Sequence, residues 1–153
     1  MTRSAGILLL AALVSSGCRP SRGGHATGGA LTVTHAVIPA PTSRSEASVF
    51  LVIENGSDTA AALTGALTPA ADSVMLHRLV GGLMQPAMPP VIPARGYLDF
   101  VPGGYHLMME GLRRPLAVGD TVTVELRFDA GRALTVRVPV LTYTEAVSEL
   151  PLR

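Results

Sequence analysis

Methionine and histidine side chains crowd into one stretch of this chain. Five of the six methionines and two of the four histidines lie between residues 75 and 109. Methionine usually serves as a flexible filler scattered through a core, so this concentration requires another explanation. Thioether sulfur combined with imidazole nitrogen is a soft ligand set, which favours Cu(I) over harder divalent ions. The composition of this stretch therefore predicts a site for monovalent copper.

The C-terminal half of this stretch offers one histidine and one methionine on a single face of a predicted strand. Side chains at positions i and i+2 of a strand point to the same side, so His106 and Met108 face together. Met109 then faces the opposite side and is expected in the core. The glycines of residues 102–104 (Pro-Gly-Gly) permit a sharp turn just before the strand. That turn is expected to aim His106 out of the sheet.

The other half of the site follows from a predicted hairpin. If Gly81 and Gly82 form a two-residue turn, Leu79 lies opposite Met84 on the returning strand. His77 and Met84 are then diagonal neighbours on one face, with Cα atoms roughly 7–8 Å apart, a gap that long side chains can close onto one ion. Two further methionines share this face by the same register and are candidate reserve ligands: Met88 first and Met75 second.

The segment PGGYHLM, residues 102–108, resembles the PGGYHxM signature of the PCuAC family of periplasmic copper chaperones. The family pattern is a histidine, ten residues, a methionine, twenty-one residues, a histidine, one residue and a methionine. Twenty-one residues separate Met84 from His106, but only six separate His77 from Met84, so the hairpin is four residues shorter. Met88 restores the first spacing and loses the second. The resemblance runs from about residue 31 to 140 and includes ASVFLVIEN and PLAVGDTVTVELRF.

This resemblance implies a function, a cargo and a fold. It implies that His77, Met84, His106 and Met108 bind one Cu(I), which the protein carries as a chaperone. It also implies that the recipient is an apo-cuproenzyme such as cytochrome c oxidase, with another copper assembly factor as a further candidate partner. The fold that it implies is an all-β, cupredoxin-like Greek-key sandwich or barrel.

The N-terminus has the pattern of an export signal. Arg3 supplies the positive region, residues 6–14 (GILLLAALV) supply the apolar region, and residues 15–17 are small. The apolar run is too short to cross a bilayer as a stable helix. We therefore expect a signal peptide over residues 1–17.

The sole cysteine, Cys18, follows this signal directly. Its setting after Val-Ser-Ser-Gly resembles the lipobox of bacterial lipoproteins, in which the cysteine is diacylated and becomes the mature N-terminus. Two or more acyl chains hold a protein firmly on a membrane. We expect a lipid anchor at Cys18 and an exported protein on the periplasmic side. By the sorting rule of such lipoproteins, Arg19 favours the outer over the cytoplasmic membrane.

The rest of the chain divides into a flexible tether (18–29), a copper-binding β domain (30–141) and a polar C-terminal tail (142–153). The tether is rich in Gly, Ser and Arg without an apolar period. His25, in the tether, is placed to assist capture of Cu(II), although we expect no specific role for it. His35 is expected to be structural.

Short alternating segments at roughly ten-residue spacing predict an all-β sandwich or barrel. The Pro-rich residues 86–93 are expected at an edge or in a loop, because proline lacks the donor that a central strand needs. The final hairpin is expected to turn around Ala130-Gly131. The predicted strands are residues 31–38, 48–55, 61–67, 73–80, 97–101, 105–112, 121–129 and 133–141.

Composition excludes several functions. The net charge is only +1, and aromatic residues make up 4% of the chain with no Trp, so a nucleic-acid partner is not expected. No acid/base or nucleophile constellation is present, so the chain is not expected to be an enzyme. An electron-transfer cupredoxin needs a Cys thiolate beside two histidines, and the only cysteine is Cys18. The alternative that stays open is a copper-buffering or metal-free structural lipoprotein whose methionines are core packing.

Overall fold

The structure, a computed structural model, describes residues 22–151. These residues form eleven strands, one 3-10 turn and one short helix. In chain order the elements are β1 (Gly24–Gly28), β2 (Leu31–Pro39), β3 (Glu46–Asn55), β4 (Ala61–Leu67), β5 (Ala71–Val80), β6 (Leu83–Pro86), β7 (Val91–Ile92), β8 (Gly96–Phe100), β9 (Tyr105–Leu112), β10 (Thr121–Phe128), η1 (Asp129–Gly131), β11 (Ala133–Leu141) and α1 (Tyr143–Glu149).

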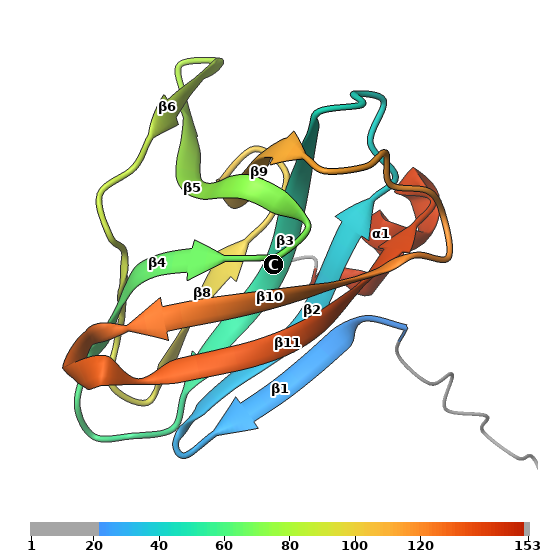
Figure 1. The fold of residues 1–153 in the computed structure, drawn as a ribbon. Coiled ribbons are helices and arrows are strands. Elements are labelled where there is room, and N and C mark those ends of the chain that lie inside the picture. Colours follow the sequence, from blue (N-terminus) through green and yellow to red (C-terminus); the bar gives the residue numbers. More distant parts are fainter. Residues whose placement is uncertain (1–21, 152–153) are drawn as a thin grey trace, which may run out of the picture.

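The strands lie in two layers that face each other (Figure 1). One layer contains β1, β2, β3, β9, β5 and β6, with β8 also paired to β3, and the other contains β11, β10, β4 and β7. The layers are joined where β2 and β11 pair in parallel through Ile38 and Val140. Buried residues of both layers form one hydrophobic core. The predicted all-β sandwich is confirmed.

Burial along the strands follows the period of two that predicted them. Every second residue of β10 and β11 is buried, because one face of this layer meets the core and the other meets solvent. The middle of β3 is buried on both faces instead. Its second face is covered by a smaller cluster made with α1: Val37, Phe50, Ala146 and Leu150.

The C-terminal segment, predicted to be a polar tail, begins with a helix that packs on the sheet. Thr142 and Glu145 form a capping box: the Glu145 amide donates to the Thr142 hydroxyl at 3.3 Å, and the Thr142 amide donates to the Glu145 carboxylate at 3.2 Å. The helix buries Ala146 against β2 and β3. The folded domain therefore extends beyond the predicted boundary at residue 141.

The prediction of a flexible tether over residues 18–29 is wrong for its second half. Residues Gly24–Gly28 form β1, which pairs antiparallel with β2. A Cβ on Gly24 would lie 2.0 Å from the carbonyl oxygen of Arg137, and one on Gly28 would lie 2.3 Å from Leu134 Cδ2. These glycines permit close approach of β1 to β11. Their abundance reflects tight packing, which composition alone does not distinguish from flexibility.

The residues just before β1 are bound to α1. The Arg22 guanidinium forms an ion pair with Glu145, and the backbone amides of Arg22 and Gly23 donate to the carboxylate of Glu149 at 3.0 and 3.4 Å. Both ends of the described chain therefore meet on one side of the sandwich. No helix among residues 22–151 is long and apolar enough to cross a membrane. The expected signal peptide and Cys18 lie outside the described residues.

We predict that Gly24→Ala lowers the free energy of unfolding by about 1–3 kcal/mol, the usual cost of forcing extra atoms into a packed site. The new methyl group would collide with the Arg137 carbonyl. Urea unfolding measures the change. Gly65→Ala is the matched control, since Gly65 also lies in a strand and a Cβ there meets nothing within 4 Å. Equal stability of the two variants would contradict the close packing of β1.

Candidate metal site

The β5–β6 hairpin has the predicted turn. Gly81 and Gly82 both have positive φ, +57° and +83°, as a two-residue turn of type I′ requires. Leu79 lies opposite Met84, and His77 lies opposite Pro86. The predicted register is therefore confirmed. It makes Met84 the diagonal neighbour of His77 on one face of the hairpin.

The antiparallel pairing of β5 with β9 brings the two histidines together. His77 lies directly opposite His106, and in the same register Met75 lies directly opposite Met108. The imidazole ring centroids are 5.8 Å apart, with the ring planes at 71°. Two histidines and two methionines thus form adjacent cross-strand pairs on one face of the sheet. Sequence alone placed each His–Met pair but not the direct opposition of the histidines.

This spacing suits a shared metal ion. A metal–nitrogen bond of about 2.0–2.1 Å puts the ion about 3.2 Å from the ring centre, so two imidazoles on one ion have centres no more than about 6.4 Å apart. The observed 5.8 Å falls within this limit. The separation of the two rings is therefore compatible with their binding one ion.

One ring nitrogen of His106 is held by the backbone, and the other has no partner. Its side chain is buried, and its Nδ1 lies 3.4 Å from the carbonyl oxygen of Gly104. A proton on Nδ1 donates to that carbonyl and leaves Nε2 as an unprotonated ligand atom. Nε2 is buried without a hydrogen-bond partner, and so is Nδ1 of His77. Both rings therefore have a nitrogen that a bound metal would satisfy.

The turn before β9 supplies that carbonyl. Gly103 has φ of +84°, and the amide of Gly104 donates to the carbonyl of Val101 at 3.0 Å. The Gly104 carbonyl also accepts a bond from the Leu79 amide at 3.4 Å. This contact ties the turn to β5, so the tight turn predicted from Pro-Gly-Gly fixes His106 relative to the strand that carries His77.

Burial lowers the pKa of His106 below its ordinary value of 6.5; the bond to the Gly104 carbonyl opposes this shift and nearby His77 adds to it. The unfolded chain then takes up a proton at a higher pH than the folded one. We predict that the metal-free protein loses free energy of unfolding as the pH falls from above 6.5 through the lowered pKa. His106→Gln should lose less over the same range. Urea unfolding at pH about 7.5 and about 5 tests the difference, and parallel losses would contradict it.

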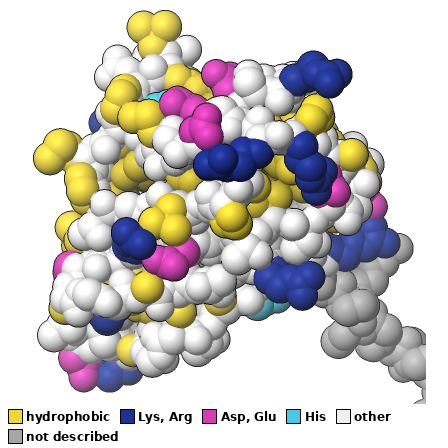
Figure 2. Space-filling view, in the orientation of Figure 1, with side chains coloured by type: hydrophobic (Ala, Val, Ile, Leu, Met, Phe, Trp, Pro, Cys, Tyr) yellow, Lys and Arg dark blue, Asp and Glu magenta, His cyan; other side chains and the backbone are white. Residues whose placement is uncertain are grey.

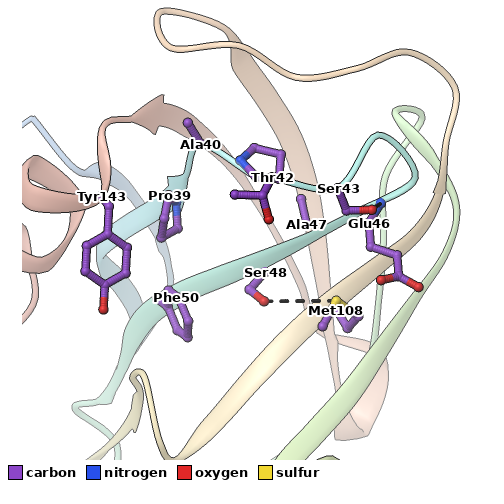
Figure 3. A pocket seen from close by; sticks show the side chains of 11 residues that line it. Pro39, Ala40, Thr42, Ser43, Glu46, Ala47, Ser48, Phe50, Met108 and Tyr143 are labelled. Atoms are coloured by element: carbon purple, nitrogen blue, oxygen red, sulfur yellow. Dashed lines mark hydrogen bonds between the residues drawn. The ribbon is translucent and has the colours of Figure 1, made fainter.

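Met108 is held on the buried side of the cluster. It is 9% exposed, and its sulfur lies 4.0 Å from the hydroxyl of Ser48, which donates to it (Figure 3). Phe50 packs against His106 with ring centres 6.2 Å apart. The next residue, Met109, is fully buried in the core, as predicted. Sequence reasoning missed Ser48 and Phe50, because only the pairing of β3 with β9 reveals them.

A hollow of about 350 Å³ opens beside Met108. In Figure 3 the Met108 side chain lies on one side of it, with Ser48 next to the sulfur and Tyr143 of α1 at the far end. The hollow leaves open space next to Met108 on the side away from β5. Its other lining residues come mainly from β3 and the loop before it, including Pro41, Ser43 and Glu46.

The remaining methionines are more exposed. Met84 is 58% exposed and Met75 is 40% exposed. Met88, 84% exposed, lines a separate hollow together with Arg78 and Tyr105. Those two residues alternate with the histidines along β5 and β9, so they point to the opposite face of the sheet. Met75 is therefore better placed than Met88 to join His77 and His106.

Hydrophobic side chains gather on the surface at the projecting β5–β6 hairpin (Figures 1 and 2). Residues 22–151 contain no group of three or more His, Cys, Asp or Glu side chains that could hold a metal. The neighbours of the histidine pair are thioethers instead. This donor set is soft, and it matches monovalent copper better than a hard or borderline divalent ion.

The sandwich has the fold of PCuAC domains. The apo PCuAC domain from PmoF1 matches with a TM-score of 0.68 at 22% identity, over 77% of this chain and 99% of that domain. The solution structure of Cu(I)-DR1885 from Deinococcus radiodurans matches with a TM-score of 0.60 at 36% identity, over 71% of this chain and 76% of that one. The predicted cupredoxin-like fold is confirmed.

Residues 31–140 match the family described as "Putative lipoprotein LpqE-like", and the chain belongs to this family. The predicted relation to PCuAC lipoproteins is thereby confirmed. The protein named "Putative lipoprotein Lxx21020" from Leifsonia xyli subsp. xyli is 38% identical over 104 residues, which cover 65% of this chain and 63% of that protein. The chain thus spans less than two thirds of the length of this relative.

Proposed function

We propose that this protein is a lipid-anchored carrier of Cu(I) outside the cytoplasm. One ion would be bound by His77, His106, Met108 and Met84, with Met75 as the first reserve ligand. The observation that carries the proposal is the direct opposition of His77 and His106, each with a buried, unpartnered ring nitrogen, beside Met108. The Cu(I)-bound state of the similar DR1885 supports the choice of cargo.

Packing alone does not account for the methionine cluster. Among the methionines of residues 22–151, only Met109 lies in the main core, while Met75, Met84 and Met88 all have large exposed fractions. Exposed thioethers contribute little to core stability, but they are available to a metal. X-ray absorption of the protein loaded with one equivalent of Cu(I) tests the proposal directly. A mixed nitrogen and sulfur shell is expected, and a protein that does not retain Cu(I) would favour the metal-free structural alternative.

The two sides of the cluster suit transfer of the ion. His106 and Met108 are buried and would hold copper from the sheet side, whereas Met84 stands in solvent on the hairpin. An incoming soft ligand would displace the exposed thioether first, so the ion would never be free. Thioethers bind without losing a proton, so this exchange requires no acid or base.

We propose that the recipient is a copper-dependent enzyme such as cytochrome c oxidase, with another copper assembly factor as a second candidate partner. The test mixes the Cu(I)-loaded protein with the apo copper domain of an oxidase and follows the recipient's metal content after separation. Transfer that is undiminished by a strong competing chelator indicates direct handover. Copper that passes only through the chelator pool would favour a buffering role.

We predict that Cys18→Ser moves the protein from the membrane fraction to the soluble fraction, or leaves it unprocessed. The expected cause is loss of the acyl chains on which anchoring depends. Fractionation of cells followed by mass spectrometry of the N-terminus measures both outcomes. Wild-type protein that carries an unmodified thiol at this position would contradict the anchor.

A further inference from the structure

A second pair of histidines lies at the opposite end of the same layer. His25 of β1 and His35 of β2 have ring centroids 6.2 Å apart, at 60°. β3 lies between this pair and the strands that carry His77 and His106. Neither residue has a part in the Cu(I) carrier proposed above.

The pair is created by a bulge in the β1–β2 ladder. Gly24 pairs with Ala36 and Ala26 pairs with Val33, so His25 alone faces two residues of β2. Those two residues are Thr34 and His35. Bulges redirect side chains locally, and here the extra residue brings a second imidazole to the same place.

The backbone at this bulge is strained in a way that glycine would avoid. His35 has φ of +54°, in the left-handed region that most side chains disfavour. His35 lies within a strand, as predicted, but the bulge interrupts the ladder at this residue.

Two neighbouring polar atoms at the bulge have no partner. Nδ1 of His35 and the hydroxyl oxygen of Thr34 are both buried without a hydrogen bond. Burial of unpaired polar atoms is costly, so each such atom needs an explanation. A metal ion would give the imidazole nitrogen its partner, and the 6.2 Å between ring centres is within the limit of about 6.4 Å for two imidazoles on one ion.

We propose that His25 and His35 bind a divalent metal ion, and that Cu(II) is the ion they bind most tightly. No thioether takes part in this pair, and imidazole with oxygen or water ligands suits Cu(II), Zn(II) and Ni(II). The order of stability among these ions places Cu(II) first. The chain then offers separate sites for the two oxidation states of copper, a soft one on β5 and β9 and a borderline one on β1 and β2.

Electron paramagnetic resonance of the protein with one equivalent of Cu(II) tests this site. The full chain is needed, because a chain cut just before Gly23-Gly24-His25 would offer its free amino group to copper. His25→Ala and His35→Gly are each expected to weaken Cu(II) binding at least about tenfold, as loss of one of two ligands implies. Glycine accepts the left-handed backbone, so His35→Gly is expected to fold.

The matched control is His106→Gln. It should keep the Cu(II) spectrum of the wild type, while His25→Ala and His35→Gly should keep wild-type Cu(I) affinity. Cu(II) binding unchanged in both bulge variants, or lost in His106→Gln instead, would overturn the proposal. Because the Cu(I) measurements are separate, failure here is distinguishable from failure of the Cu(I) carrier.

Discussion

Replacing His106 with alanine is expected to lower the Cu(I) affinity at least about tenfold and up to about a hundredfold. Losses of about 10- to 100-fold are typical even when the residue removed only hydrogen-bonds to a metal ligand. His106 offers a neutral imidazole whose Nδ1 contacts the Gly104 carbonyl and whose Nε2 has no other partner. No other described histidine lies opposite His77. Competition with a chromophoric Cu(I) chelator measures the change.

Two further variants separate loss of the ligand from loss of the fold. His106→Gln keeps a polar side chain of similar reach against Phe50 and should leave the circular dichroism spectrum unchanged, yet it should bind Cu(I) nearly as weakly as the alanine variant. His25→Ala removes a histidine of the other pair and should retain full Cu(I) affinity. Wild-type affinity in both His106 variants would refute the carrier function.

The hairpin and the strand faces were predictable because local chemistry determines them. Gly81 and Gly82 accept the positive φ of a two-residue turn, and that turn sets the register of Leu79 opposite Met84. The alternation of β9 separates Met108 from Met109 in the same way. Such features depend only on neighbours in sequence, so they can be read from the chain itself.

Features that depend on distant pairing were not predictable. The hydroxyl of Ser48 reaches Met108 only because β3 pairs with β9, sixty residues further along the chain. β6 ends at Pro86, and the sequence of the hairpin does not determine where the chain then carries Met88. Glycines that allow β1 to pack closely against β11 look the same in sequence as glycines of a flexible linker. What distinguishes them is their contact with residues far along the chain, such as Arg137.

The docked β1 also alters how the proposed anchor would act. Arg22 is bound to α1, so only three residues separate Cys18 from the folded domain. Four residue steps span at most about 14 Å. If the lipid is attached at Cys18, the domain would stay close to the membrane surface, with the α1 side nearest to it. A recipient protein would then reach the proposed Cu(I) site only within a limited range of distances from the membrane surface.

Met108→Leu is expected to weaken Cu(I) binding at least about tenfold, since it removes the thioether on the buried side while conserving volume. Its sulfur is positioned by Ser48, and its neighbour across the strand pair is Met75. Stability should change little, because Leu and Met exchange at small cost in packed sites. Chelator competition and urea unfolding, performed together, measure the two effects.

The same measurement on Met84→Leu and Met75→Leu identifies the remaining sulfur ligand. Met84 is diagonal to His77 on the hairpin side, whereas Met75 lies opposite Met108, so the two thioethers flank the histidine pair from opposite directions. A large loss in Met84→Leu alone supports the ligand set implied by the PCuAC spacing. A large loss in Met75→Leu alone would mean that the copper ligands lie on β5 and β9 only, and that the shortened hairpin contributes none. In either case Met88→Leu should bind normally, because Met88 lies with Arg78 and Tyr105 on the other face.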